Sequence, residues 1–279
     1  MFVIAESGST KIDWAIVYQD QSVRQMTTPG INPSLRDPMT TLRLPEELLH
    51  HIQHSGDIHF YGAGIISLKT SALVKDWLIS HGIANNIFTY EDLLASARAC
   101  CGSEEGIACI LGTGSNSCVY DGKKIVRAVP TLGYMLSDEG SGFHLGKKII
   151  TSYFYGEMPE KVKKSFEEQY PITKEQVIES IYKKPEGNKY IASFTKFLSG
   201  ADITWRKAIL HEVFDSFLQT RVLYYHVSTD IPVNFVGSIA FHFQTELKEI
   251  LDKYKLHSKN IIQKPLDALI EYHKTNTNL

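Results

Sequence analysis

The segment LSDEGSGFHLGKKI, at residues 136–149, sets two adjacent carboxylates directly before three small residues. Asp138 and Glu139 precede Gly-Ser-Gly, and a helix is expected over residues 139–155. Small residues let a ligand approach the backbone closely, so a carboxylate beside them can face a bound molecule. Acidic residues are also typical of a helix N-terminus, where the helix dipole stabilises them. That second interpretation suits Glu139 better than Asp138.

Two short turns could bind an anion. ESGSTK, at residues 6–11, and GTGSN, at residues 112–116, each lie between two expected strands. Tight turns rich in Gly, Ser and Thr expose backbone N–H groups that can hold a phosphate, and Lys11 adds positive charge. Hairpin turns also use these residue types for geometry alone, and neither turn has the Walker A spacing. Because one such turn opens each half of the chain, the pair predicts a clamp on a polyphosphate.

A third glycine-containing turn follows a later apolar run. FVGSIA, at residues 235–240, reads as a strand, Gly237-Ser238 and the start of a helix. A glycine there allows a flat group to lie against the backbone at a helix N-terminus. An ordinary strand-to-helix turn would have the same sequence, so this segment leaves both interpretations open.

The turns belong to two halves of similar design. Residues 2–18 read as strand, turn and alternating strand, and residues 106–129 repeat this pattern with a third strand. Further strands are expected at residues 57–61, 86–90 and 260–263, and in IPVNFV at residues 231–236. Helices are expected at residues 70–81, 91–101, 139–155, 174–183, 189–198, 204–227, 240–254 and 265–273. Residues 157–184 are rich in Lys and Glu, which predicts a solvated helical region.

Composition excludes several classes of function. The net charge is -2, without the basic excess typical of nucleic-acid binding, so no nucleic-acid partner is expected. No apolar run approaches a membrane span, and we expect no signal peptide and no membrane partner. The four cysteines, Cys100, Cys101, Cys109 and Cys118, lack the spacing of a zinc site. We interpret them as buried thiols in a reducing compartment, which predicts a cytoplasmic protein.

Taken in order, the segments ESGSTK, YGAG, YEDLLASARA, GIACILGTGSNS, LSDEGSGFHLGK and FVGSIA resemble the N-acetylglucosamine kinase and BadF-BadG-BcrA-BcrD ATPase family. The resemblance covers essentially the whole chain, and GTGSN and DEGSG at this separation are its most specific features. It implies an α/β fold of two ribonuclease-H-like, actin-like ATPase lobes with an interlobe cleft. The lobes implied are residues 1–102 with 265–279, and residues 103–264.

The resemblance also implies roles for individual residues. Asp92, after the strand at residues 86–90, matches the general base, although a first-turn helix carboxylate is the plainer interpretation and Glu91 is adjacent. Asp138 matches a family residue that contacts the sugar or the metal-bound phosphates. Glu6 matches one that holds Mg²⁺ through water. The implied nucleotide contacts are Ser7, Gly8, Ser9, Thr10, Lys11, Gly112, Thr113, Gly114, Ser115, Gly237 and Ser238. The implied sugar contacts are Asn32, Gly62, Asp92, Thr113 and Asp138.

The first turn departs from the family pattern. The family has three glycines and a threonine after the acidic residue, whereas this chain has Ser7-Gly8-Ser9 before Thr10. Serine keeps the turn small but fits a left-handed backbone less well than glycine. Asn32, followed by proline, is also an ordinary turn signal.

The function implied is transfer of phosphate from Mg-ATP to an amino sugar, N-acetylglucosamine or glucosamine at the 6-hydroxyl, by a homodimer. N-acetylmannosamine and glucose stay open as substrates. One rival is an ATPase that energises a partner reductase through a cysteine-bound iron–sulfur cluster, which adjacent Cys100 and Cys101 do not suit. Another is a sugar-sensing pseudo-kinase without turnover.

Overall fold

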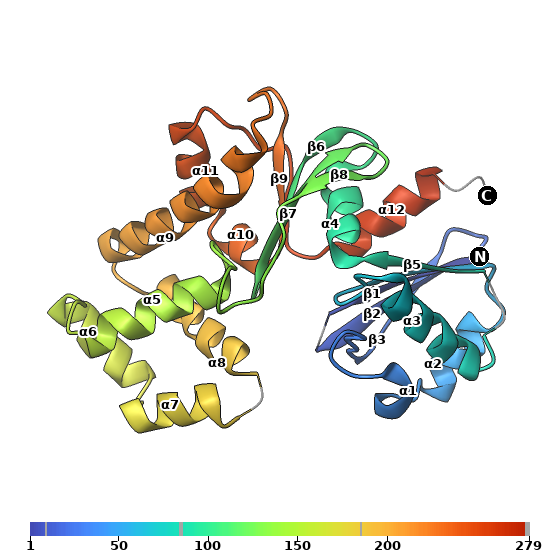
Figure 1. The fold of residues 1–279 in the computed structure, drawn as a ribbon, viewed down its shortest axis with the longest axis horizontal. Helices are drawn as coiled ribbons and strands as arrows, with labels where there is room; N and C mark the ends of the chain where they lie inside the picture. The colour runs from blue at the N-terminus through green and yellow to red at the C-terminus, as the bar shows by residue number, and fades with distance from the viewer. Residues whose placement is uncertain (9, 84–85, 185, 277–279) are drawn as a thin grey trace. The chain divides into compact units, whose positions relative to one another are not determined.

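The computed structural model describes residues 1–8, 10–83, 86–184 and 186–276 of the 279-residue chain. Internal contacts divide the chain into two units (Figure 1). Unit 1 comprises Met1–Glu104, Gly122–Ile125 and Lys264–Leu279, and unit 2 comprises Glu105–Asp121 and Val126–Gln263. Each unit is built on its own five-stranded sheet.

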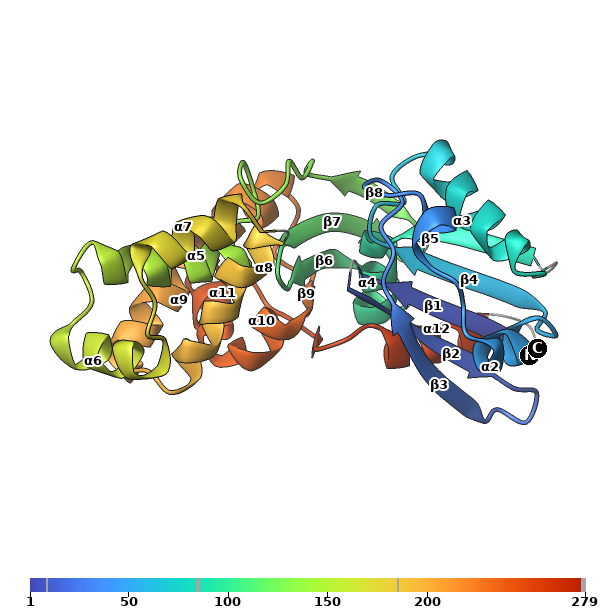
Figure 2. The same ribbon diagram turned by 90° about the horizontal axis from the view of Figure 1, so that it is seen from below.

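The sheet of unit 1 has the strand order β3-β2-β1-β4-β5 (Figure 2). Its strands are β1 (Phe2–Ser7), β2 (Lys11–Val17), β3 (Val23–Pro29), β4 (Asp57–Gly62) and β5 (Asn86–Glu91). The first three form an antiparallel meander, whereas β4 and β5 continue the sheet parallel to β1. Parallel strands normally have both faces covered, so successive residues of β1, which point to opposite faces, should all be apolar. Phe2, Val3, Ile4 and Ala5 are indeed all buried.

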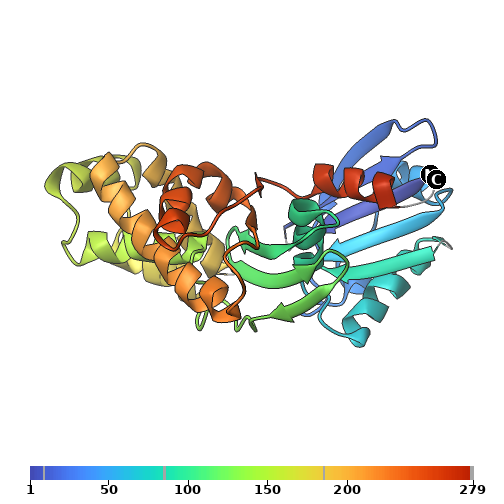
Figure 3. The same ribbon diagram turned by 90° about the horizontal axis from the view of Figure 1, so that it is seen from above.

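Helices cover both faces of this sheet. The helices are α1 (Pro38–Thr41), α2 (Glu46–Ile52), α3 (Leu68–Ser80), α4 (Asp92–Cys101) and α12 (Leu266–Asn276). On one face, Leu48 of α2 and Trp77 of α3 join a core with Val3 and Trp14. On the other, Ala95 of α4 and Leu269 of α12 pack in a second core. Figure 3 shows α4 and α12 side by side on that face.

The sheet of unit 2 repeats the topology of the first. Its strands are β6 (Glu105–Leu111), β7 (Ser115–Asp121), β8 (Ile125–Ala128), β9 (Val233–Val236) and β10 (Ile261–Ile262). Their order, written from the third strand of the meander, is β8-β7-β6-β9-β10, the same as β3-β2-β1-β4-β5. In both units the first strand is antiparallel to the second and parallel to the fourth. The repeated pattern in the sequence is therefore a repeated fold.

The helices of unit 2 share one hydrophobic core with its sheet. They are α5 (Gly142–Phe154), α6 (Glu160–Gln169), α7 (Lys174–Tyr182), α8 (Gly187–Ser193), α9 (Ile203–Phe217), α10 (Ser238–His242) and α11 (Gln244–Lys253). The prediction of a merely solvated helical region at residues 157–184 is wrong in one respect. Val162 and Phe166 of α6 and Val177 of α7 are buried in the core, so these helices are amphipathic.

Several expected helices have different bounds; the one expected over residues 189–198, for example, is the α-helix Gly187–Ser193 followed by a 3₁₀ helix, Phe194–Ser199. The helix expected over residues 204–227 ends at Phe217 and passes into a π-helical turn, Leu218–Val222, and a 3₁₀ turn. The one expected over residues 240–254 is two helices that meet at Phe243. The helix expected from Glu139 begins at Gly142, because the Ser141 side chain caps it by accepting from the N–H of His144.

The third strand of the first meander, β3, was not predicted. Most of its side chains are exposed, so they lack the apolar alternation that marks a half-buried strand. Elsewhere, all four cysteines are buried as expected, and the Sγ atoms of Cys100 and Cys101 are 3.8 Å apart. No helix in the described part of the chain is long and apolar enough to span a membrane.

Candidate functional site

The carboxyl ends of three parallel strands meet at one edge of the sheet in unit 1. Ser7 of β1 pairs with Gly62 of β4, which pairs with Glu91 of β5. Asp92 follows Glu91 as the first residue of α4. In open α/β sheets this edge is where ligands bind. The register therefore brings three predicted site segments, ESGSTK, YGAG and YEDLL, into one row.

Glu6 has an unusual electrostatic environment at this edge. Burial, and then the charges of Asp13 and Asp92, raise the pKa of Glu6 to about 7, while Lys11 and Lys264 act in the opposite direction. Asp13 lies directly opposite Glu6 in the β1–β2 ladder. A cation near Glu6 would relieve this repulsion between carboxylates. Asp13 belongs to no motif in the sequence, although the hairpin register predicted from the turn could have identified it.

Asp92 is more enclosed than its neighbour Glu91, which is exposed. Burial raises the pKa of Asp92, and the backbone N–H groups of Leu93 and of Asp92 itself partly offset this effect. Burial of the same kind, together with the charge of Asp92, raises the pKa of Glu91. A half-buried carboxylate with a raised pKa at a ligand-binding edge has the character of a proton acceptor.

The first turn is a tight hairpin. The N–H of Gly8 donates to the carbonyl of Lys11 at 2.9 Å, and Lys11 Nζ forms an ion pair with Asp13. The buried Ser7 hydroxyl donates to the carbonyl of Ile31, so this hydroxyl is used inside the fold. Thr10 is exposed, whereas Ser9 lies outside the described residues. Neither Ser7 nor Gly8 has a left-handed backbone, so serine in place of glycine causes no strain at position 7.

Asn32 forms a local turn beside the YGAG segment. Its Oδ1 accepts hydrogen bonds from the N–H and the hydroxyl of Ser34, at 3.1 and 2.6 Å. Gly64 has φ +83°, and a Cβ there would stand 2.0 Å from Asn32 Oδ1. Gly64 therefore permits close approach of the two segments, and Gly62 precedes it at the end of β4. The turn role of Asn32 is observed, and its sugar contact stays a prediction.

In unit 2, the turn between β6 and β7 is tied to the start of α5. The N–H of Gly142 donates to the carbonyl of Gly112 at 2.8 Å, and that of Phe143 donates to Thr113 at 3.0 Å. Within the turn, the N–H of Gly112 donates to the carbonyl of Gly114. The GTGSN and DEGSG motifs are therefore neighbours in space, although their separation in sequence did not require this.

Asp138 lies against this turn. A Cβ on Gly114 would stand 2.8 Å from Asp138 Oδ2, so glycine makes room for the carboxylate. Asp138 has φ +71°, an uncommon left-handed conformation for a residue with a side chain. Burial raises the pKa of Asp138, whereas the N–H of Ser115 and the charge of Arg221 lower it. The buried Ser115 Oγ has no hydrogen-bond partner among the described residues.

Glu139 does not act as a helix-terminal carboxylate. Its Oε2 accepts from both Nε and a terminal nitrogen of Arg221, each at 3.2 Å. The expectation of an acidic helix start is wrong for this residue, because α5 begins three residues later and Glu139 is an ion-pair partner. Arg221 was missed in the sequence, where it stands inside an unbroken helical pattern without any local signal.

Gly237 connects the third motif to the same place. Its φ is +127°, and a Cβ there would stand 2.3 Å from the carbonyl oxygen of Leu111 and 3.1 Å from the nitrogen of Gly112. Only glycine allows the turn after β9 to lie against the end of β6. Ser238, which is exposed, begins α10. In unit 2, the three predicted motifs GTGSN, DEGSG and FVGSIA therefore lie next to one another.

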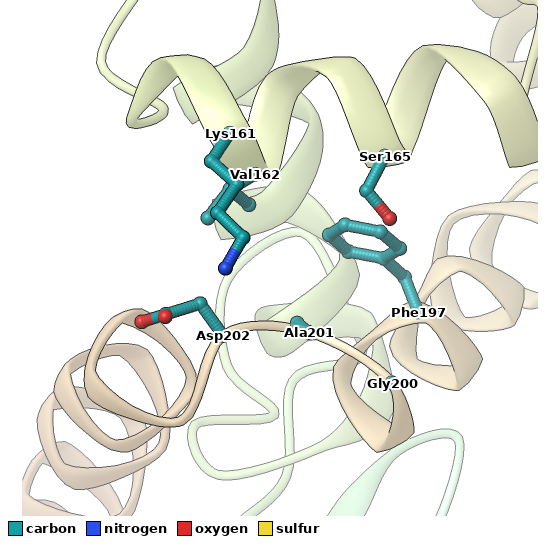
Figure 4. A pocket seen from close by; sticks show the side chains of 7 residues that line it. All are labelled: Lys161, Val162, Ser165, Phe197, Gly200, Ala201 and Asp202. Atoms are coloured by element: carbon teal, nitrogen blue, oxygen red, sulfur yellow. The ribbon is translucent and has the colours of Figure 1, made fainter.

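Two hollows, one in each unit, lie away from these motifs. One, of about 210 Å³, is lined by Lys161, Val162, Ser165, Phe197, Gly200, Ala201 and Asp202 (Figure 4). Another, of about 400 Å³, is lined by Met39, Leu42, Arg43, Trp77, Ser80 and His81. Neither contains a predicted site residue, so the candidate site rests on the motifs at the sheet edges.

Comparison with known proteins bears on the family and the fold. Neither the models of protein families nor the curated proteins give a match. Among solved structures, a proposed N-acetylglucosamine kinase of Porphyromonas gingivalis is 40% identical, with a TM-score of 0.91 and 99% of both chains covered. A proposed N-acetylglucosamine kinase of Chromobacterium violaceum is 13% identical, with a TM-score of 0.72 over 97% of this chain and 98% of that one.

A more distant likeness concerns the fold alone. MreB5 of Spiroplasma citri, solved with AMPPNP, has 12% identity and a TM-score of 0.56 over 99% of this chain and 95% of that one. Together with the repeated β3-β2-β1-β4-β5 order, this confirms the predicted class of two ribonuclease-H-like, actin-like ATPase lobes.

Proposed function

The chain belongs to the family of N-acetylglucosamine kinases, which are ATP-dependent carbohydrate kinases, and we propose that it phosphorylates the 6-hydroxyl of an amino sugar, N-acetylglucosamine in the first place. The choice of sugar follows the description of the Porphyromonas gingivalis protein, which is similar over 99% of both chains. The choice of the 6-hydroxyl follows the family that the motifs resemble.

The observation that carries the proposal is the position of Asp92. It is half-buried, it follows the carboxyl end of β5, and its charge acts on Glu6 at the same edge. A base that serves a sugar hydroxyl needs a raised pKa and partial exclusion of water, and Asp92 has both. Glu91, which is exposed, suits that role less well.

The proposed reaction is a phosphoryl transfer. The oxygen of the sugar hydroxyl forms a bond to the γ-phosphorus, the bond from that phosphorus to the bridging oxygen of ADP breaks, and the hydroxyl proton passes to the Asp92 carboxylate. ADP leaves with the bridging oxygen and its electron pair. Positioning of the reactants and neutralisation of charge provide most of the rate acceleration in such reactions.

The residues near Glu6 fit a magnesium ion. Burial, and then repulsion from Asp13 and Asp92, raise the pKa of Glu6 to about 7, and a cation at its carboxylate oxygen would relieve that repulsion. Mg²⁺ usually takes one or two protein carboxylates, with water and phosphate oxygens as its other ligands. When bound, the ion would neutralise charge on the phosphates. We propose Glu6 as its contact, through water, with Asp13 beside it.

The nucleotide is proposed to contact the glycine-containing turns. In unit 1 these contacts are the backbone of Ser7 and Gly8, with Thr10 and Lys11, and in unit 2 they are Gly112, Thr113, Gly114, Ser115, Gly237 and Ser238. Asp138, held against Gly114, is proposed to orient the sugar hydroxyl or the phosphates. Asn32, Gly62 and Thr113 are the further proposed sugar contacts.

The test is ADP release from Mg-ATP with a panel of N-acetylglucosamine, glucosamine, N-acetylmannosamine and glucose. We expect one amino sugar to stimulate release strongly. Asp92→Asn keeps the size of the side chain and removes the proton acceptor, so kcat should fall by about 10²- to 10⁴-fold. The matched control is Glu91→Gln, which alters the adjacent exposed carboxylate and should keep kcat within a few-fold.

Two results would contradict the proposal. If no sugar stimulates ADP release while ATP still binds, the protein is not a kinase for these sugars. If Glu91→Gln loses activity and Asp92→Asn keeps it, the general base has been assigned to the wrong residue.

A further inference from the structure

Arg221 connects both ends of the segment that carries Asp138. Its Nε and one terminal nitrogen donate to Glu139 Oε2 at 3.2 Å, directly after Asp138. Its other terminal nitrogen donates to the carbonyl of Pro130 at 3.1 Å, with Val129 O at 3.5 Å. One guanidinium therefore holds a loop at its two stems. The planar arrangement of donors in arginine suits this task, whereas the point charge of lysine does not.

The position of Arg221 depends on a local irregularity of the helix. The α-helix α9 ends at Phe217, and residues Leu218–Val222 form a π-helical turn. Such turns are rare and often occur at functional sites. Gly140 packs against the same region, because a Cβ there would stand 2.6 Å from Phe217 Cβ. The loop and the π-turn are thus fitted to each other at two points.

Outside the Arg221 contacts, the loop is held by the ring of Tyr134 against Phe143 of α5, with centroids 5.0 Å apart, and by the N–H of Ser115 at Asp138. Leu132, Met135 and Leu136 are exposed to 65%, 78% and 75%, so apolar burial does not fix this segment. Its internal bonds are local: the N–H groups of Leu136 and Ser137 donate to the carbonyl of Gly133, and the Ser137 hydroxyl accepts from the N–H of Leu132 and donates to the same carbonyl. The left-handed backbone of Asp138 also costs energy that other contacts must offset.

We propose that Arg221 is a positioning residue, which acts through Glu139 and the Val129–Pro130 carbonyls to hold the Asp138 carboxylate against the turn at Gly114. The proposal rests on the function proposed above, because it makes Arg221 part of that site. Arg221 is 3% exposed, and its role is to orient Asp138 without itself touching the substrate. Loss of the guanidinium would release the loop and leave Glu139 without its partner.

The test uses the full chain and three variants. Arg221→Met removes the guanidinium, and Arg221→Lys keeps only its charge. Arg206→Met is the matched control, because Arg206 pairs with the buried Glu246 at 2.7 Å and links α9 to α11 instead of the loop. The measurements are kcat and KM for the sugar, hydrogen exchange of the Leu136 and Ser137 amides, and the midpoint of thermal unfolding.

We expect Arg221→Met to raise exchange of those two amides by about tenfold or more, since their protection depends on the closed loop. It should lower kcat/KM for the sugar by about a hundredfold, because a misplaced group can cost this much. In Arg221→Lys, the increase in exchange and the loss of kcat/KM should both be smaller than in Arg221→Met. Arg206→Met should lower the unfolding midpoint, with neither kinetics nor exchange in the loop altered.

The proposal is overturned if exchange of the Leu136 and Ser137 amides is unchanged in Arg221→Met, or if Arg206→Met raises it equally. Because hydrogen exchange does not need turnover, this result separates the two proposals. A wild-type protein that phosphorylates no sugar refutes the proposed function, and the exchange data still decide whether Arg221 holds the Asp138 loop.

Discussion

A buried pair of histidines predicts that unit 1 loses stability in mild acid. The rings of His59 on β4 and His273 on α12 lie 4.0 Å apart, and both side chains are buried. Arg98 donates to the Tyr61 hydroxyl at 2.7 Å, and that hydroxyl lies 2.8 Å from His273 Nε2. A neutral His273 that carries its proton on Nδ1 accepts the Tyr61 proton at Nε2, while Tyr61 accepts from Arg98.

Burial also favours the neutral form of both histidines. Burial lowers the pKa of His59 to about 4, with Arg98 adding to the effect and Asp57 opposing it. Burial, His59 and Arg98 lower the pKa of His273 to about 3. His59 Nε2 has no hydrogen-bond partner among the described residues. The remaining groups packed here, Tyr90 and Tyr272, lie with their rings close to the Arg98 guanidinium.

The size of the effect follows from proton linkage. In the unfolded chain a histidine takes up a proton near pH 6.5, whereas His59 in the folded chain does so only near pH 4. The stabilising contribution is therefore complete above the unfolded pKa and is lost as the pH falls from 6.5 toward 4. Between about pH 7.5 and about pH 5, His59 alone accounts for a loss of about 2 kcal/mol.

The assay is denaturant unfolding at these two pH values in a Trp205→Phe background, so that the buried Trp14 and Trp77 report on unit 1. His59→Phe keeps an aromatic ring without a titrating nitrogen, and it should reduce the pH-dependent loss by about 2 kcal/mol. His54→Phe, the same change at an exposed position, should not. If the free energy of unfolding of His59→Phe falls between the two pH values by as much as that of the wild type, the reasoning is refuted.

Two further predictions concern glycines. Gly146→Ala would place a Cβ 1.9 Å from the carbonyl oxygen of Ile191, where α5 crosses α8, and thermal unfolding should register a loss of about 1–3 kcal/mol in unit 2. An unchanged midpoint would mean that the two helices can separate without cost. Gly114→Ala would place a Cβ 2.8 Å from Asp138 Oδ2 and should lower kcat with little change in stability, as steady-state kinetics and a thermal melt can determine. Loss of stability with intact kcat would contradict the role given to Asp138.

Much of the fold could be predicted because its signals are local. Apolar runs, alternating residues and Gly/Ser turns identify the two meanders, since hairpins depend on neighbouring residues. The edge strand β3 was missed because its exposed side chains carry no such alternation. The π-helical turn after Phe217 was missed for the opposite reason, since its sequence continues an ordinary helical pattern.

The residues of the candidate site were likewise predictable only where their signal lies within one segment of the sequence. The motifs identified Asp92, Asp138 and the glycine-containing turns, because these residue types are recognisable in a single segment. No sequence signal pointed to Arg221, which is 82 residues from Glu139, or to His273, which is 212 residues from Tyr61. Asp13 could be found only through its register with Glu6.

By itself, the sequence determined most of the strands along the chain, the candidate residues for phosphate binding and proton transfer, and the family. The tertiary structure alone decided which of them are neighbours and in what environment. The row of Ser7, Gly62 and Glu91 comes from strand register. The raised pKa of Glu6 and the pairing of Glu139 with Arg221 come from burial and from charges brought together by folding. Such effects depend on distance in space, which a linear pattern does not contain.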